Sequence, residues 1–75
     1  MSARPVKRSL TLQGHRTSVS LEEPFWQAFR DIARAEGRAL NTLAAEIDAT
    51  RDPQTGLASA IRVFVLRHYR ETNDA

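Results

Sequence analysis

The chain has 75 residues, no cysteine and a formal net charge of +2 at pH 7. A monomer of this size buries little apolar surface, and neither a disulfide nor a zinc site is expected to compensate, because thiols are absent and only two histidines are present. Oligomerisation is therefore the expected source of further stability, and no apolar run approaches the roughly 18 residues that a membrane-spanning helix needs.

The basic residues are unevenly distributed along the chain. Residues 1–20 contain four of them and no acid, a pattern that attracts a polyanion when two such segments lie together in a dimer. We expect residues 1–7 to form a flexible basic arm, because they include Pro5 and little that could be buried. No continuous apolar stretch follows these basic residues, so the segment does not look like a secretory signal and a cytoplasmic location is expected.

Residues 16–21 alternate between polar and apolar side chains, which predicts a β-strand. The side chains fall on two faces, an apolar one with Thr17, Val19 and Leu21 and a polar one with Arg16, Ser18 and Ser20. A lone strand cannot satisfy its backbone groups, and no later strand is available in the chain. The strand therefore pairs either with its counterpart across a two-fold axis or with Ser9–Leu12 through a turn at Gly14, and the sequence leaves both arrangements open.

Apolar stripes at helical spacing predict helices at about 23–36, 40–50 and 57–70. Ser20 or Glu22 is placed to cap the first helix, and Asn41 or Thr42 to cap the second. The third helix is apolar around most of its circumference, so we expect a second subunit against one side of it. The predicted dimer core contains Val19, Leu21, Phe25, Trp26, Phe29, Ile47, Ile61, Phe64 and Val65. Residues 71–75 are expected to form a polar tail.

The stretch RTSVSLEEPFW at 16–26, followed by an amphipathic helix, Glu36-Gly37 and a second helix, resembles the ribbon-helix-helix regulators of the Arc and MetJ type. More narrowly, residues 14–26, 44–48 and 59–70 are similar to short bacterial proteins described as ribbon-helix-helix domain proteins. The resemblance covers residues 8–70. It implies a mainly α fold with one N-terminal β-strand, built as an intertwined homodimer.

Simple members of that family stop after two helices, so the helix from Leu57 is an addition. Either of the last two helices could correspond to the family's second helix, and the shorter spacing favours residues 40–50. The N-terminus of that second helix binds DNA phosphate in the family, because its free N–H groups and helix dipole favour an anion.

The resemblance also assigns DNA contacts. It places base contacts in the major groove on Arg16, Ser18 and Ser20, where arginine suits guanine and serine suits either base type. The residues expected to contact phosphate are Arg38, Asn41, Thr42, Arg8 and His15. For His15 a contact with the turn, or no role, remains an alternative, and three arginines of the last helix, Arg62, Arg67 and Arg70, are interpreted as a solvated face.

These features predict sequence-specific binding of double-stranded DNA by a homodimeric transcriptional regulator, nucleoid-associated when bound, with larger assemblies on DNA left open. The alternative is an antitoxin-like or adaptor dimer that acts through a protein partner, although only about five polar residues follow the last helix. No enzyme, cofactor or metal is expected, because the sequence has no glycine-rich phosphate loop and no histidine pair at ligand spacing.

Overall fold

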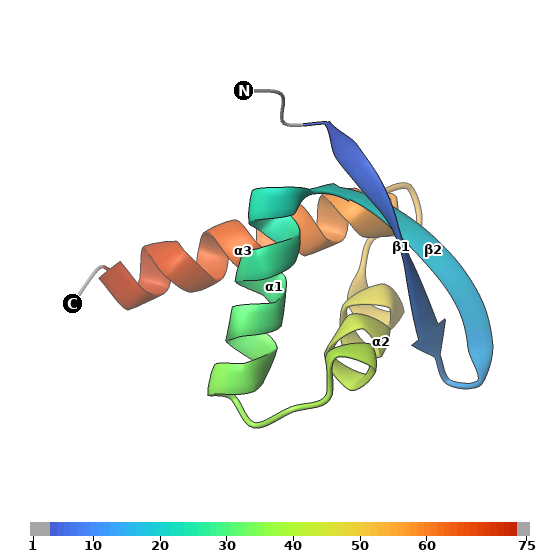
Figure 1. Cartoon of the computed structure of the whole chain (residues 1–75), viewed down its shortest axis with the longest axis horizontal. Helices are drawn as coiled ribbons and strands as arrows, with labels where there is room; N and C mark the ends of the chain where they lie inside the picture. Colours follow the sequence, from blue (N-terminus) through green and yellow to red (C-terminus); the bar gives the residue numbers. More distant parts are fainter. Residues whose placement is uncertain (1–3, 74–75) are drawn as a thin grey trace.

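The computed structural model describes residues 4–73, in which a two-stranded sheet is followed by three helices (Figure 1). In chain order the elements are β1 (Pro5–Leu12), β2 (His15–Glu22), α1 (Glu23–Ala35), α2 (Leu40–Thr50) and α3 (Leu57–Asn73). The fold is mainly helical, as predicted, but it has two N-terminal strands where one was expected. Within the described part of the chain, no helix is long and apolar enough to cross a membrane.

The two strands form an antiparallel hairpin, so β2 pairs with a strand of its own chain. The register runs unbroken from Pro5 opposite Glu22 to Leu12 opposite His15. Gln13 and Gly14 connect the strands with φ values of 52° and 84°, and two positive φ values are typical of the type I′ turn, whose twist matches that of a hairpin.

The hairpin corrects the predicted flexible arm. Residues 5–7 lie in β1, because the register continues to the far end of β2 and gives their backbone groups a partner. Residues 1–3 of the predicted arm lie outside the described residues.

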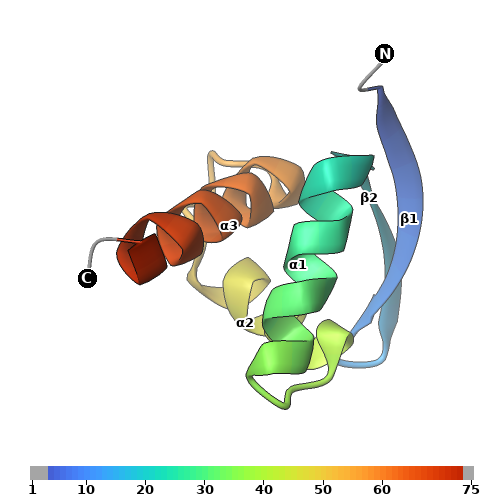
Figure 2. The ribbon, with the colours of Figure 1, turned by 60° about the vertical axis from the view of Figure 1, so that its left-hand side comes forward.

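One face of the hairpin lies against the helices, and all three helices are on that side of the ribbon (Figure 2). Leu10, Val19 and Leu21 are buried on this inner face, with 2%, 4% and 0% of their surface exposed. Thr17 was predicted to share this face and lies opposite Leu10, but it is exposed. The helices therefore cover the inner face incompletely towards the turn.

Phe29 of α1 is fully buried, and the ring of Phe64 meets it edge-on at a centroid distance of 6.2 Å. The predicted dimer-core residues that are buried within one chain are Val19, Leu21, Trp26, Phe29, Ile47, Ile61 and Val65. Phe25 and Phe64 are partly buried and pack against the same core. Within one chain, β1 and α3 thus bury much of the apolar surface that the sequence analysis had assigned to contact with a second subunit.

The helix ends explain why α1 and α2 are separate. Gly37 has φ +66°, and the N–H groups of Gly37 and Arg38 donate to the carbonyls of Arg34 and Ala33, which is the Schellman arrangement. Glu22, one of the two predicted caps of α1, occupies the N-cap position but makes no side-chain capping bond. The predicted caps of α2 are wrong, because its N-cap position is Ala39, which makes no side-chain capping bond either. Asn41 lies inside α2, and its side-chain oxygen accepts a hydrogen bond from the hairpin, described below.

Candidate nucleic-acid interface

The side of the hairpin that faces away from the helices is polar from Lys7 to the turn on β1 and from the turn to Ser20 on β2. Directly opposed residues of an antiparallel pair project from the same side of the sheet. At the open end of this side Pro5 lies opposite Glu22, whose carboxylate is paired with Arg62. The other three opposed pairs are Lys7 with Ser20, Ser9 with Ser18, and Thr11 with Arg16, and all six residues are exposed. We call these six residues the outer face of the hairpin.

The outer face has the chemistry of a surface that recognises base edges. Lys7 and Arg16 supply cationic donors, and four hydroxyl groups can donate or accept. A two-stranded ribbon is narrow enough to enter the major groove of B-DNA. The predicted base-contact residues of β2 lie together on this face, and β1 doubles the set.

The sequence offered Ser9–Leu12 as a possible partner strand, but it did not indicate that the strand begins at Pro5 or that Lys7, Ser9 and Thr11 share the face of Arg16. In β1 the polar residues Lys7, Ser9 and Thr11 occupy every second position, and the apolar Leu10 lies between two of them. This alternation is typical of a strand. Arg8 interrupts that alternation, because it is charged and yet lies on the inner face opposite Val19. A strand predicted from apolar alternation alone therefore begins only after residue 8.

Arg8 is held against α1 and not on the outer face. Its guanidinium forms an ion pair with Glu23 and lies over the ring of Trp26, 5.3 Å from the centroid. The side chain of Arg8 is 31% exposed. The Glu23 carboxyl has a lowered pKa, chiefly because Gln27 donates a hydrogen bond to it, with the charge of Arg8 contributing. Arg8 therefore positions the hairpin on α1 in this structure.

Both edges of the hairpin are attached to helices. At the edge of β1, the backbone N–H of Thr11 donates to the side-chain oxygen of Asn41 at 3.1 Å. At the edge of β2, Arg62 of α3 donates to the carbonyl of Ser20 at 3.4 Å. These contacts fix the ribbon relative to α2 and α3.

Arg62 was predicted to belong to a solvated face, but it forms a two-point ion pair with Glu22, with N–O distances of 2.8 Å and 3.2 Å. Hydrogen bonding from Arg62 is the main reason why the pKa of Glu22 is lowered. This contact joins residues 40 positions apart, so the local sequence pattern gives no signal of it.

The N-terminus of α2 lies next to the turn end of the hairpin. A hollow of about 450 Å³ between them is lined by Thr11, Gln13, Asn41 and Thr42 together with three residues farther along α2. The N–H of Leu43 donates to Ala39, so the N–H groups of residues 40–42 precede the hydrogen-bond ladder of the helix. The hydrogen bond from Thr11 to Asn41 brings this helix end and the outer face together.

The remaining predicted phosphate contacts lie near this end of the molecule in different environments. Thr42 is exposed on the first turn of α2. Arg38 precedes α2 and forms ion pairs with Glu36 and Glu46, with 29% of its side chain exposed. His15 is exposed at the start of β2, beside the turn.

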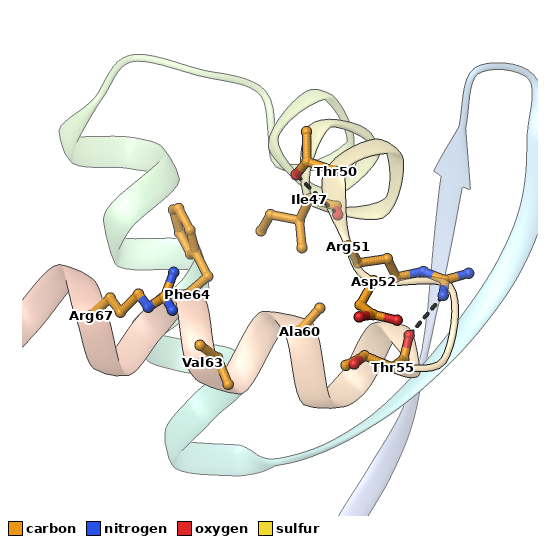
Figure 3. A pocket seen from close by; sticks show the side chains of 9 residues that line it. All are labelled: Ile47, Thr50, Arg51, Asp52, Thr55, Ala60, Val63, Phe64 and Arg67. Atoms are coloured by element: carbon orange, nitrogen blue, oxygen red, sulfur yellow. Dashed lines mark hydrogen bonds between the residues drawn. The ribbon is translucent and has the colours of Figure 1, made fainter.

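A second hollow, of about 370 Å³, lies between α2 and α3 (Figure 3). Ile47, Val63 and Phe64 give it an apolar floor, and Arg51 closes one end, where it donates to the carbonyl of Thr55 at 2.7 Å. None of its lining residues belongs to the outer face of the hairpin. Among the described residues, no group of three potential metal ligands is found here or elsewhere.

Comparison with protein families decides what kind of domain this is. The sequence matches the family model of the ribbon-helix-helix domain over residues 5–69. The chain belongs to the ribbon-helix-helix domain family. Searches of curated proteins and of solved structures give no match. Ribbon-helix-helix domains are typically DNA-binding or regulatory domains without catalytic activity, and they generally form dimers.

The family match includes β1 and most of α3, so these two elements are part of the ribbon-helix-helix domain here and not flanking additions. The match therefore extends beyond the resemblance noted from the sequence, which began at residue 8.

Proposed function

We propose that this ribbon-helix-helix protein binds double-stranded DNA sequence-specifically and regulates transcription, with the hairpin inserted in the major groove. One observation carries the proposal. The outer face presents two cations and four hydroxyl groups, and the one acid on this side, Glu22 at the open end, is paired with Arg62, while the inner face of the same ribbon is anchored in the core. A ribbon held in this way presents its polar face without further rearrangement.

Arg16, Ser18 and Ser20 are the proposed base contacts of β2. An arginine can donate two hydrogen bonds to guanine, and a serine hydroxyl can contact either base type. All three are exposed, and their backbone is held in register by β1. The side chains of these three residues are therefore accessible to a ligand.

The first turn of α2 is the proposed phosphate anchor. Asn41 and Thr42 lie where the helix presents its positive end, and His15 lies at the neighbouring turn end of β2. Arg38 can exchange Glu46 for a phosphate at small cost, because exposed ion pairs contribute little free energy. Arg8 is left out of the anchor, since it would have to leave both Glu23 and the ring of Trp26.

We also propose that two copies associate in the active form. Val63, Leu66 and Tyr69 are 46%, 56% and 38% exposed and follow one another at helical spacing along α3. A second copy that covers this stripe would leave both hairpins open to DNA, and the complex would be nucleoid-associated in a cytoplasmic setting.

The experiment is selection from a random double-stranded DNA pool with the natural protein and an Arg16→Ala/Ser18→Ala/Ser20→Ala variant. We expect the natural protein to enrich a short motif and the variant to lose it. Arg34→Ala removes an exposed cation of α1 outside the ribbon and is the charge control. Enrichment that survives in the triple variant would contradict the assignment of base contacts, and absence of any enrichment would contradict DNA recognition.

The exposed stripe of α3 also supports a second candidate, an antitoxin-like or adaptor dimer that acts through a protein partner. Leu66→Ser would then abolish capture of the partner, whereas Arg16→Ala would leave capture unchanged, because Arg16 lies on the hairpin and not on α3. If capture is unaffected while DNA selection succeeds, the adaptor function is rejected.

A further inference from the structure

We propose that the hollow between α2 and α3 is a binding site for a small monocarboxylate with an apolar body, such as a straight-chain or aromatic acid (Figure 3). The apolar body lies against Ile47, Val63 and Phe64, and Arg67 binds the carboxylate. The site shares no residue with the outer face of the hairpin, so it does not depend on the proposed DNA function. Of the exposed stripe through which two copies would associate, only Val63 lines the hollow.

The size and lining of this hollow suit a small apolar ligand. Its volume of about 370 Å³ lies at the lower end of the range of roughly 300–1,000 Å³ that is usual for ligand pockets. Two other hollows, next to the hairpin, are larger at about 450 and 490 Å³, but neither is lined by phenylalanine, tyrosine or tryptophan. Of these three hollows, the one between α2 and α3 is therefore the best suited to an apolar ligand.

The apolar side of the hollow is held in place by the core. Ile47 is 9% exposed and belongs to the core, and the ring of Phe64 meets the buried ring of Phe29 edge-on. Ala60 of α3 also lines the hollow, and its methyl group leaves space that a larger side chain would fill (Figure 3). A ligand therefore meets side chains that are already ordered, which lowers the entropic cost of binding.

One end of the hollow carries a net negative charge. Arg51 closes this end, but it is already paired, because its Nε donates to Asp48 at 2.8 Å and its Nη1 donates to the carbonyl of Thr55 at 2.7 Å. Asp52 lies at the same end, where its carboxylate accepts the N–H of Gln54 at 2.8 Å (Figure 3). Within residues 4–73 Asp52 forms no ion pair, so its charge is not balanced by a cation.

Arg67 supplies a cation at the other end. It lies about one helical turn after Phe64, lines the hollow and is exposed. In the described part of the chain it takes part in no ion pair. Its guanidinium is therefore available to a carboxylate, which arginine can bind through two parallel hydrogen bonds.

These charges predict which ligands are preferred. A monocarboxylate places its charge at Arg67 and its apolar end towards Asp52. A dicarboxylate would bring a second negative charge to Asp52. An ammonium group would be repelled by Arg67 at one end and would meet the guanidinium of Arg51 at the other, so a cation is disfavoured at both ends.

The apolar body supplies most of the affinity, because an exposed ion pair contributes little free energy. Burial of one methylene group lowers the dissociation constant by about four-fold. We therefore expect the Kd of octanoate to be about ten-fold lower than the Kd of hexanoate.

The experiment is titration of the natural protein with octanoate, followed through the NMR shifts of backbone amides. Hexanoate, octan-1-ol, octylamine and octanedioate are the comparison ligands. We expect saturable shifts at residues 47–52 and 60–67, and weaker binding of all four comparison ligands than of octanoate.

Arg67→Gln should weaken octanoate binding by about five-fold and leave the binding of octan-1-ol unchanged. Arg70→Gln is the matched control, because Arg70 is an exposed arginine of the same helix that does not line the hollow. Ala60→Leu fills the hollow and should abolish the octanoate shifts. If Ala60→Leu does not fold, Val63→Asp at a 46% exposed position supplies a second test, because its charge repels the carboxylate.

Several results would overturn the proposal. Equal binding of octan-1-ol and octanoate, or equal effects of Arg67→Gln and Arg70→Gln, would show that Arg67 does not recognise the carboxylate. Tighter binding of octylamine would contradict the proposed polarity of the site. Absence of saturable shifts, as expected if a second copy fills the hollow, would overturn the site itself. None of these measurements uses DNA, so they leave the DNA function to its own test.

Discussion

Replacement of Leu10 by alanine tests whether β1 belongs to the folded core. Leu10 is 2% exposed, and truncation of a buried leucine to alanine costs about 2–5 kcal/mol through lost transfer free energy and the cavity left behind. The hairpin is open on its outer side and can relax towards the cavity, so we expect about 2–3 kcal/mol. A domain of this length has a free energy of unfolding of roughly 4–11 kcal/mol, so the loss is a large share of it.

The assay is urea unfolding for the free energy and thermal unfolding for Tm, both followed by fluorescence of Trp26, the single tryptophan, which is 7% exposed and lies in the same core. At about 4–8 °C per kcal/mol, the expected fall in Tm is about 8–24 °C. Leu12→Ala is the matched control, because Leu12 has the same side chain on the same face of β1 but is only partly buried.

We expect Leu12→Ala to cost about 1 kcal/mol or less. If Leu10→Ala fails to fold, Leu10→Val supplies the smaller step in the same direction. A loss of less than about 0.5 kcal/mol in Leu10→Ala would refute the packing of β1, because surface substitutions give changes of that size.

Three further outcomes are expected. Gln13→Asn should raise stability by about 0.5–1 kcal/mol, because asparagine tolerates the φ of 52° better than glutamine, and thermal melts should show a rise in Tm of about 2–8 °C. The pKa values of Glu22 and Glu23 are lowered in the folded protein, so these two groups contribute stability that is fully present above their usual pKa of 4.5. This stability is lost as the pH falls through the lower folded-state pKa. The Tm of the natural protein should therefore drop below pH 4.5, and the drop should be smaller in Glu22→Gln. Arg38→Ala should weaken binding to specific and random DNA alike and lower the slope of log affinity against log salt by about 0.9; a loss confined to one sequence would contradict a phosphate contact.

The helices could be predicted from the sequence because their information is local. The apolar stripe with Phe29 and Ile32 has the period of a helix, and Gly37 follows as the residue that a Schellman end requires. The polar face with Arg16 could likewise be recognised from alternation alone. Periodicity assigns a residue to a face, and this is sufficient wherever an element is long and regular.

The partner of each face could not be predicted in the same way. Arg8 lies on the inner face because Glu23 and Trp26 receive it there, and Asn41 leaves its expected capping role because Thr11 offers an N–H. These contacts join residues 15 to 30 positions apart, and periodicity carries no information about them. The same reason explains why a core attributed to two subunits is buried largely within one.

β1 and α3 together meet the two structural needs of the strand β2. A strand such as β2 needs a partner for its backbone and a cover for its apolar face. In this chain β1 satisfies the first need and α1 with α3 the second, and Arg62 of α3 also occupies the edge at which another chain would pair. Within this chain β2 therefore has both a strand partner and a cover for its apolar face. Under the proposed function, association of two chains determines how many DNA half-sites are bound and at what spacing.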